Sequence, residues 1–359
     1  MATIYDVARA AGVSTATVSR VFRTPETVSS RLRHRVKAAA VELGYRPNRV
    51  AQALAEGKSR AIGLLLPPDY GNVYFTILMA TTERLVSASG RELVVASYTD
   101  RDPGSWVDHL QGLLDRQIEG CLAFGESDQF AEGLDRGALA EIPVVGLGSW
   151  PCSGLPVVGP DEERAGCIAT EYLLHLGHRR IAFLGLDWET FPTWRRESGY
   201  LSALRSAGLE PVFEATSPEE PTESRLATFR LMEAHQDVTA ILGVNDGAAA
   251  GAARALHEMG ILVPDEVSVM GFDNVPMCQF MCPSLSSVDL SVEATAAEAV
   301  RRLLQAVEHL GEGALSTRTV LQPRLVARES TAQAPVDGRH REHAPTVTRE
   351  EGCEVARTL

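Results

Sequence analysis

The chain lacks long apolar runs, and none of its runs reaches the ~18 residues that a helix needs to cross a bilayer. It also lacks the charged start and apolar stretch of a signal peptide. Its six cysteines are scattered, and no histidine or second cysteine pair joins Cys278 and Cys282 in a zinc-binding set. We therefore expect a cytoplasmic protein with reduced thiols, no bound metal or cofactor and no membrane contact.

Familiar catalytic motifs are missing as well. The chain contains no Gly-x-Ser-x-Gly elbow, no phosphate-binding loop ending in Gly-Lys-Ser/Thr, no Gly-x-Gly-x-x-Gly after the first predicted strand and no His-Glu-x-x-His. Together with the pattern of the amino terminus, these absences predict that the protein is not an enzyme.

The amino terminus has the pattern of a helix-turn-helix. Residues 3–22 predict two short helices joined by a tight turn at Gly12, which can adopt the positive φ that ends the first helix. Ser14 can cap the second helix, whose Val18 and Val21 face inward. The outer face then carries Thr15, Ala16, Thr17, Ser19 and Arg20.

These outer side chains predict how the head reads DNA. Arginine is the side chain best suited to bond O6 and N7 of guanine together, so Arg20 is the leading base reader. Ser14, Thr17 and Ser19 are better suited to phosphate oxygens. The alternative is that the helical hairpin belongs to an ordinary small bundle, with these residues simply solvated.

The charge distribution favours DNA binding over that alternative. Residues 1–60 hold 11 Lys and Arg against 4 Asp and Glu, a net charge of +7, whereas the whole chain carries −13. The remaining residues therefore sum to −20. A basic head on an acidic protein is expected when only the head touches a polyanion.

The first 60 residues resemble the LacI-type (lactose-repressor) family of bacterial transcription regulators. The likeness continues after the hairpin through Val28-Ser29, Arg31, Val36, Ala39-Ala40, Leu43-Gly44-Tyr45 and Pro47 to Ala51. A third helix is expected to start at Ser29 or Ser30 and to stop at Gly44. The resemblance also adds Ile4, Tyr5 and Ser29 to the predicted DNA contacts and sets a DNA-binding domain at 1–47.

Residues 48–60 are expected to form a hinge helix and linker. In the family, that helix folds when two subunits pair on the operator, and the resemblance implies that Leu54 is its minor-groove wedge. Ala51 would let the helix approach the groove floor, and Asn48 would hold a phosphate or sugar. Alternatively, Leu54 packs on the core.

From residue 61 onward, short apolar runs alternate with amphipathic stretches, which predicts an α/β core with doubly wound parallel sheets. The predicted strands are 62–66, 93–96, 121–124, 144–147, 181–184, 240–244 and 267–272, and the predicted helices are 74–89, 107–116, 163–176, 196–207, 247–259 and 292–310. The length suits two such lobes.

This core resembles the type I periplasmic-binding-protein fold that the family shares, through 161–166, 176–182, 196–200, Asn245-Asp246, Val263-Pro264 and 271–274. The resemblance implies three crossings between the lobes, near Pro160, Ser287 and Leu321. We therefore expect a core at 61–330, with an N-lobe at 61–160 and 289–320, a C-lobe at 161–287 and 321–330, and a disordered tail at 331–359.

An effector site is expected between the lobes, because ligands of open α/β sheets bind beyond the carboxyl ends of the strands. Arg196, Asn245 and Asp273 match the family positions that hold polar groups of an effector, and together they suit sugar hydroxyls. Each could instead be a cap or salt-bridge residue, and Asn245 in particular could start a helix. Tyr74, Phe75 and Trp194 are the candidate aromatic contacts, with ordinary packing as the alternative.

The resulting prediction is a homodimeric repressor that binds a near-palindromic double-stranded DNA operator and responds to a small effector, most simply a sugar. A charged residue that many sugar-binding relatives have is replaced here by Gly148, Ser149 and Trp150. A non-sugar corepressor such as a nucleobase, or a regulator with no effector response, therefore stays open.

Overall fold

The computed structural model describes residues 2–45, 59–67, 72–98, 103–125, 142–148, 155–186, 194–216, 221–309 and 318–335. The chain divides into two compact units, residues 1–60 and 61–359, and each is described by itself. Asn48, Ala51 and Leu54 of the predicted hinge lie outside the described residues. Within the described part, no helix has the length and apolarity needed to span a membrane.

The first unit is a small helical domain. Its elements are α1 (Ile4–Ala10), α2 (Thr15–Arg23), the 3₁₀ helix η1 (Pro25–Thr27) and α3 (Ser30–Glu42). Gly12 has φ +58°, as the predicted turn requires, and the Ser14 hydroxyl caps α2 by accepting from the Thr17 N–H. Val7, Val18 and Val36, one from each α-helix, are completely buried and form the centre of its core.

The second unit contains two six-stranded sheets with matching strand orders, β11-β5-β4-β3-β1-β2 in the N-lobe and β12-β10-β9-β8-β6-β7 in the C-lobe. Among the described strands, every neighbouring pair is parallel except β10 and β12. The N-lobe strands are β1 (Ala61–Leu66), β2 (Glu92–Ser97), β3 (Gly120–Phe124), β4 (Val144–Leu147), β5 (Val157–Pro160) and β11 (Arg318–Leu321). The C-lobe strands are β6 (Ile181–Leu186), β7 (Val212–Thr216), β8 (Ala240–Gly243), β9 (Ser268–Phe272), β10 (Ser286–Asp289) and β12 (Arg324–Val326).

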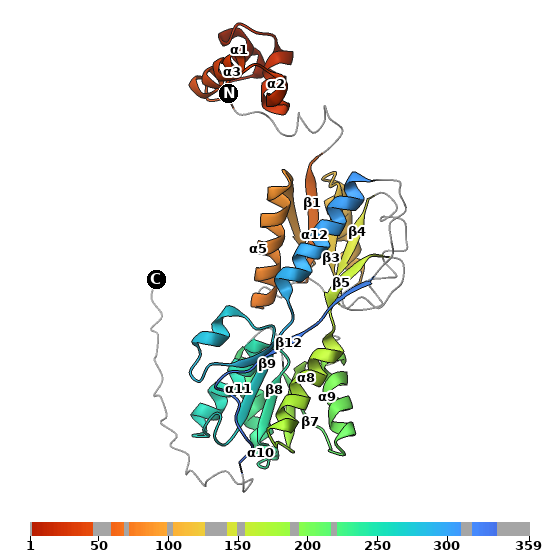
Figure 1. The fold of residues 1–359 in the computed structure, drawn as a ribbon, viewed down its shortest axis with the longest axis vertical. Helices are drawn as coiled ribbons and strands as arrows, with labels where there is room; N and C mark the ends of the chain where they lie inside the picture. The colour runs from red at the N-terminus through yellow and green to blue at the C-terminus, as the bar shows by residue number, and fades with distance from the viewer. Residues whose placement is uncertain are drawn as a thin grey trace, which may run out of the picture. The chain divides into compact units, whose positions relative to one another are not determined.

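Helices flank both sheets, and the central strands are buried along their whole length because they are covered on both faces. The helices are α5 (Val73–Ala88), α6 (Pro103–Leu114), α8 (Glu162–His175), α9 (Trp194–Ser206), α10 (Pro221–Ala234), α11 (Asp246–Glu258), α12 (Val292–Glu308) and the 3₁₀ helix η3 (Pro276–Phe280). In the N-lobe, α5 and α12 pack side by side (Figure 1). The expected α/β class with two parallel sheets is confirmed.

The chain passes between the lobes three times. The first passage follows Pro160, where β5 ends and α8 begins. The second lies between the end of β10 at Asp289 and the start of α12 at Val292, and the third joins β11 to β12 after Leu321. The first and third passages are joined directly, because the Asp161 N–H donates to the Leu321 carbonyl at 3.0 Å.

The expectation of disorder from residue 331 onward is wrong for residues 331–335, which continue the C-lobe. The Ala334 N–H donates to the Leu176 carbonyl at 2.8 Å, and the Thr331 hydroxyl lies 3.1 Å from that of Tyr172. The buried ring of His178 lies 3.1 Å from the Ala332 carbonyl oxygen, and burial lowers the pKa of this ring. Hydrogen bonds to the C-lobe hold this segment, and composition does not reveal such bonds.

Candidate DNA-reading head and effector site

In the head, the predicted base reader is available to DNA. Arg20 and Ala16 are exposed on α2, and its cap residue Ser14 is also exposed, while Thr15, Thr17 and Ser19 are half-buried on the same helix. A short helix with one solvated face and one buried valine face suits insertion into a major groove.

The other predicted DNA contacts differ in exposure. Tyr5 is 69% exposed on α1, whereas Ile4 is half-buried and packs against the core of the head. Ser29 is exposed immediately before α3, where its side chain makes no capping bond to the helix. The Ser14 hydroxyl lies 2.9 Å from that of Thr17, so these two side chains orient each other at the start of α2.

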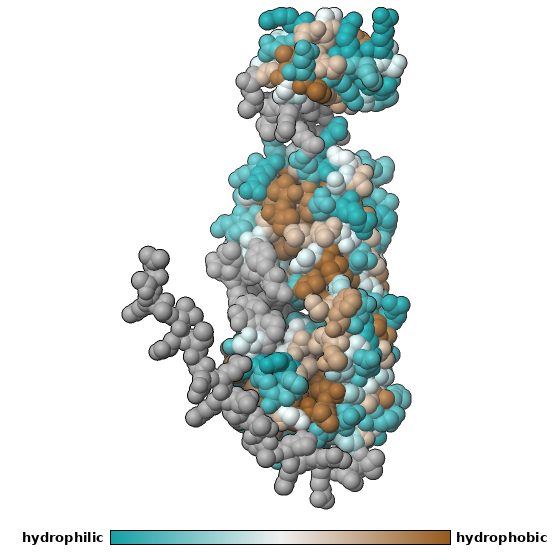
Figure 2. All heavy atoms as spheres, turned by 90° about the vertical axis from the view of Figure 1, so that its left-hand side faces the viewer, coloured by the Kyte–Doolittle hydropathy of each residue, from teal (hydrophilic) through white to brown (hydrophobic). Residues whose placement is uncertain are grey.

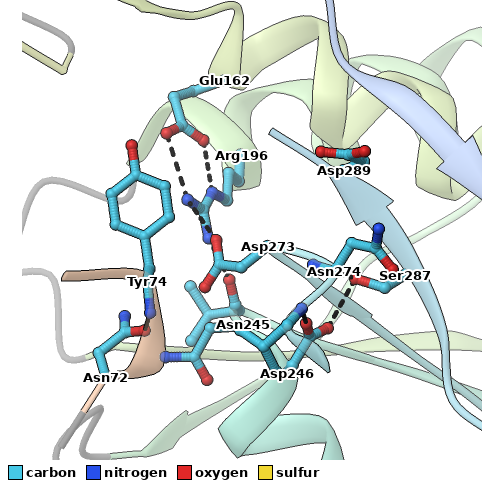
Figure 3. Close-up of polar contacts among 12 residues, drawn as sticks. Asn72, Tyr74, Glu162, Arg196, Asn245, Asp246, Asp273, Asn274, Ser287 and Asp289 are labelled. Carbon is cyan, nitrogen blue, oxygen red and sulfur yellow. Dashed lines mark hydrogen bonds and ion pairs between the residues drawn. The ribbon is translucent and has the colours of Figure 1, made fainter. Parts of the chain in front are cut away.

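In the C-lobe, the structure brings Arg196 and Asp273 together. Arg196 lies near the start of α9 and Asp273 follows β9, and the Arg196 Nη2 and Asp273 Oδ1 atoms are 3.5 Å apart (Figure 3). The same guanidinium donates to the Val244 carbonyl at 2.6 Å and lies 5.3 Å from the centre of the Phe272 ring. The two side chains are 12% and 3% exposed, so they form a nearly buried charged pair.

Glu162 is a third charged residue in contact with this pair, and the sequence did not identify it. Its carboxylate accepts from Arg196 Nε at 2.5 Å and from Nη2 at 3.2 Å, so the contact is bidentate. Glu162 is the first residue of α8, directly after the first passage between the lobes. The sequence showed an acidic helix start at 161–163, which is common in any helix, and it gave no sign of which carboxylate would reach α9.

In the loop after β9, Asp273 is held in an unusual backbone conformation. Asp273 and Asn274 have φ values of +97° and +53°, a region that residues other than glycine rarely adopt. The Asp273 N–H donates to the Val288 carbonyl at 2.9 Å, and Arg328 donates to the Asn274 side-chain oxygen at 2.6 Å. These bonds fix the turn so that the Asp273 carboxylate reaches Arg196.

Another carboxylate, that of Asp246, hydrogen-bonds to the same loop. Its oxygens accept from the Ser287 hydroxyl at 2.6 Å and from the Val275 N–H at 2.8 Å (Figure 3). Burial raises the pKa of Asp246 to about 6, although the bonds from Ser287 and Val275 act in the opposite direction. Asp246 thus joins α11 to the loop after β9 and to β10.

Asn245 serves as the cap of α11. Its side-chain oxygen accepts from the Ala248 N–H at 2.7 Å, and the residue is 7% exposed. The helix-start interpretation that the sequence left open is therefore observed. A ligand at this position would meet the amide nitrogen of Asn245, because its oxygen is engaged by the helix.

The N-lobe contributes an aromatic cluster formed by Tyr74, Phe75 and Phe124. Phe75 and Phe124 meet edge to face with ring centres 4.9 Å apart, and Tyr74 meets Phe75 at 5.5 Å. In the view of Figure 3, Tyr74 of this lobe is drawn next to Arg196 and Asp273, and Asn72 is drawn below Tyr74. Gly148, with φ +89°, lies against Phe124, since a Cβ there would meet that ring at 3.2 Å. The side chain of Trp194 lies outside the described part.

The head and the core together define a class of protein, a regulator with a DNA-binding head and a ligand-binding core. Its core offers carboxylate, guanidinium and amide groups on one lobe and aromatic rings on the other. In the described part of the chain, no group of three His, Cys, Asp or Glu side chains is arranged to hold a metal ion.

Comparisons with known proteins identify the family. Residues 3–48 match the bacterial regulatory proteins of the lacI family, and residues 170–331 match a periplasmic binding protein-like domain. The transcriptional regulator DegA of Bacillus subtilis (strain 168) is 32% identical over 335 residues, which cover 92% of this chain and 98% of DegA. The chain belongs to the lacI family.

Two solved structures show the extent of the likeness. The Lac repressor dimer bound to operator and the anti-inducer ONPF has a TM-score of 0.83 and 26% identity, over 92% of this chain and 99% of its own. A periplasmic binding protein/LacI transcriptional regulator from Alkaliphilus metalliredigens QYMF, complexed with D-xylulofuranose, has a TM-score of 0.65 and 26% identity, over 76% of this chain and 99% of its own.

Proposed function

We propose that this protein is a transcriptional repressor whose affinity for its operator is set by a sugar bound between the two lobes. The observation that carries the proposal is the nearly buried Arg196 and Asp273 pair, 3.5 Å apart, on a lobe whose partner lobe carries an aromatic cluster. Vicinal hydroxyls can donate to a carboxylate and accept from a guanidinium at the same time. An aromatic ring can cover the apolar face of a sugar.

The related regulator that holds D-xylulofuranose supports a sugar as the effector class. On this reading Arg196, Asn245 and Asp273 hold hydroxyls, and Tyr74 and Phe75 contact the ring. Trp194, at the start of α9, is a further candidate.

Two heads of a homodimer would read the two halves of a near-palindromic operator. Arg20 is the proposed base reader, with Thr15, Ala16, Thr17, Ser19 and the nearby Ile4, Tyr5, Ser14 and Ser29 as the surrounding DNA contacts. We extend the proposal to the hinge, where Leu54 would enter the minor groove beside Ala51 and Asn48.

A dimer would be joined through both lobes. Figure 2 views the side of the molecule on which α5 lies and shows apolar patches on the second unit. Large apolar side chains that are exposed include Val73 and Met79 on α5 and Met277 and Phe280 on η3. Partly exposed apolar side chains on both lobes suit a two-fold interface.

Effector and operator would be linked through the three passages between the lobes. A sugar that closes the lobes would move the two hinge segments relative to each other in the dimer. Operator affinity would then change by the difference in effector binding free energy, typically about 1–3 kcal/mol.

The DNA part is tested with Arg20→Ala. We expect operator binding to weaken by about 1–3 kcal/mol and preference at one base pair to relax, because a bidentate guanine contact is lost. Binding of variant oligonucleotides at fixed salt measures both effects. Arg9→Ala, at an exposed arginine on α1, is the matched control, and an equal loss on every DNA sequence would make Arg20 a phosphate contact.

The effector part is tested by a thermal-shift screen of sugars followed by Asp273→Ala. A sugar that binds the native state raises its melting temperature. We expect the variant to lose this rise while its operator affinity is retained, since Asp273 is far from the head in sequence and lies in the second unit. Asp237→Ala, at an exposed carboxylate paired with Arg180, is the control. An unchanged dose response in Asp273→Ala would remove Asp273 from the site.

A further inference from the structure

We infer that Glu162 makes the site select effectors by their charge. The site therefore takes a neutral sugar and discriminates against sugar phosphates and sugar acids. The inference rests on the proposed sugar site and specifies the chemical class of its ligand. It concerns a residue outside the predicted effector contacts.

The first step is how Arg196 is already engaged. Two of its nitrogens face the Glu162 carboxylate at 2.5 and 3.2 Å, and a third donates to the Val244 carbonyl at 2.6 Å. The Glu162 and Arg196 side chains are 11% and 12% exposed, so water screens this contact weakly. An arginine that recognises a phosphate or carboxylate uses the same fork of donors that Glu162 occupies here.

The second step is the balance of charge. Glu162 and Asp273 are acidic and Arg196 is basic, so these three contacting side chains carry a net charge of −1. Asp246 and Arg328, which hydrogen-bond to the loop after β9, carry opposite charges. An incoming anion would therefore meet a neutralised guanidinium and a nearby carboxylate, which disfavours its binding. Neutral hydroxyls can still donate to the carboxylate oxygens.

The third step is that Glu162 is not needed to start its helix. Asp161 caps α8 by accepting from the Arg164 N–H at 3.0 Å, so the Glu162 side chain is directed to Arg196 instead. Its neighbour Glu163 carries the same charge on the same turn but is exposed. The pair Glu162 and Glu163 thus offers a matched test and control.

The experiment uses the full-length protein and chemically paired probes. D-ribose is compared with D-ribose 5-phosphate, D-glucose with D-glucose 6-phosphate and D-gluconate, and inorganic phosphate is the simplest anion. Thermal shift and calorimetry are run on the wild type, Glu162→Gln, Glu163→Gln and the double variant Glu162→Gln/Arg196→Gln. Phosphate binding by the DNA-binding head is common to all four proteins. Subtracting the signal of one protein from that of another therefore cancels its contribution.

We expect the wild type to prefer the neutral member of a pair. Glu162→Gln should shift the ratio of anionic to neutral affinity by about tenfold towards the anion, because it removes one charge and frees the guanidinium fork. Glu163→Gln should leave the ratio unchanged, and the double variant should lose the gain. A loss of folding alone would weaken both members of a pair and leave their ratio unaltered.

A wild type that binds the phosphate or acid more tightly than its parent sugar would overturn the inference. So would a Glu162→Gln variant whose ratio and phosphate binding match those of Glu163→Gln. If no sugar binds any protein but phosphate binds Glu162→Gln alone, the proposed sugar effector fails while the charge rule stands.

Discussion

The two lobes of the core share one strand order, yet their contributions to the proposed effector site differ. The C-lobe supplies Glu162, Arg196 and Asp273, which are nearly buried and paired with one another. The N-lobe supplies Tyr74 and Phe75, which meet edge to face. The repeated topology provides two sets of strand ends, and the residues placed on them decide what each side can bind.

The two lobes also differ in the interactions that hold their site residues in place. We call the site residues of each lobe its wall. The C-lobe wall depends on specific polar bonds, such as those from Ser287 and Val275 to Asp246. The N-lobe wall depends on ring packing, which tolerates replacement by other apolar groups of similar size. We therefore expect changes in the C-lobe to cost more than changes in the N-lobe.

The largest effect is expected for Asp246→Ala. It leaves the Ser287 hydroxyl and the Val275 N–H without their buried acceptor, so the free energy of unfolding should fall by about 3 kcal/mol. Urea titration followed by circular dichroism measures the loss. Asp237→Ala breaks an exposed pair with Arg180 and should cost less than about 1 kcal/mol. Equal losses in the two variants would contradict the contrast between buried and exposed carboxylates.

A smaller effect is expected from pH. The pKa of Asp246 is raised to about 6 from 3.8, so its contribution to stability is fully present below pH 3.8 and is lost as pH rises through about 6. Between pH 8 and pH 5, the wild type should therefore gain about 1 kcal/mol relative to Asp246→Asn. Urea midpoints of both proteins at the two pH values test this. A gain of opposite sign would mean that the carboxylate is better stabilised in its charged form.

The smallest effect is expected for Phe75→Leu in the N-lobe. Phe75 is a proposed contact of the sugar ring, and the change keeps an apolar side chain at this position but removes the aromatic face that would cover the sugar. Effector affinity should fall about threefold, as measured by calorimetry with a sugar from the screen. A loss as large as that in Asp273→Ala would show that the aromatic wall is as important as the charged one.

Much of the fold was predictable because its signals are local. The run 144–147 matches β4, and 62–66 and 181–184 fall within β1 and β6, since strands buried on both faces have continuous apolar sequences. Two of the elements that were missed have weaker patterns. Residues 212–216 of β7 are only partly buried, and β12 is a three-residue strand.

The candidate site was predicted in part. Arg196 and Asp273 were placed at the ends of strands, where parallel sheets collect ligand-binding residues. Glu162, Ser287 and Phe124 were not identified, because each lies far from its partner in sequence and its residue type has ordinary roles elsewhere. The sequence left two interpretations of Asn245 open, and the structure shows the helix cap, whose bond to the Ala248 N–H no sequence pattern could establish.

The sequence by itself determined the basic helix-turn-helix, the alternation of buried strands and amphipathic helices and the acidic core, because these follow from composition and from periodicity along the chain. Tertiary structure decided which carboxylate neutralises Arg196 and which one supports the loop of Asp273. Those contacts join residues 34 and 29 positions apart, as in Glu162 with Arg196 and Asp246 with Val275. Pairing over such separations depends on how the strands and helices pack, which no local pattern specifies.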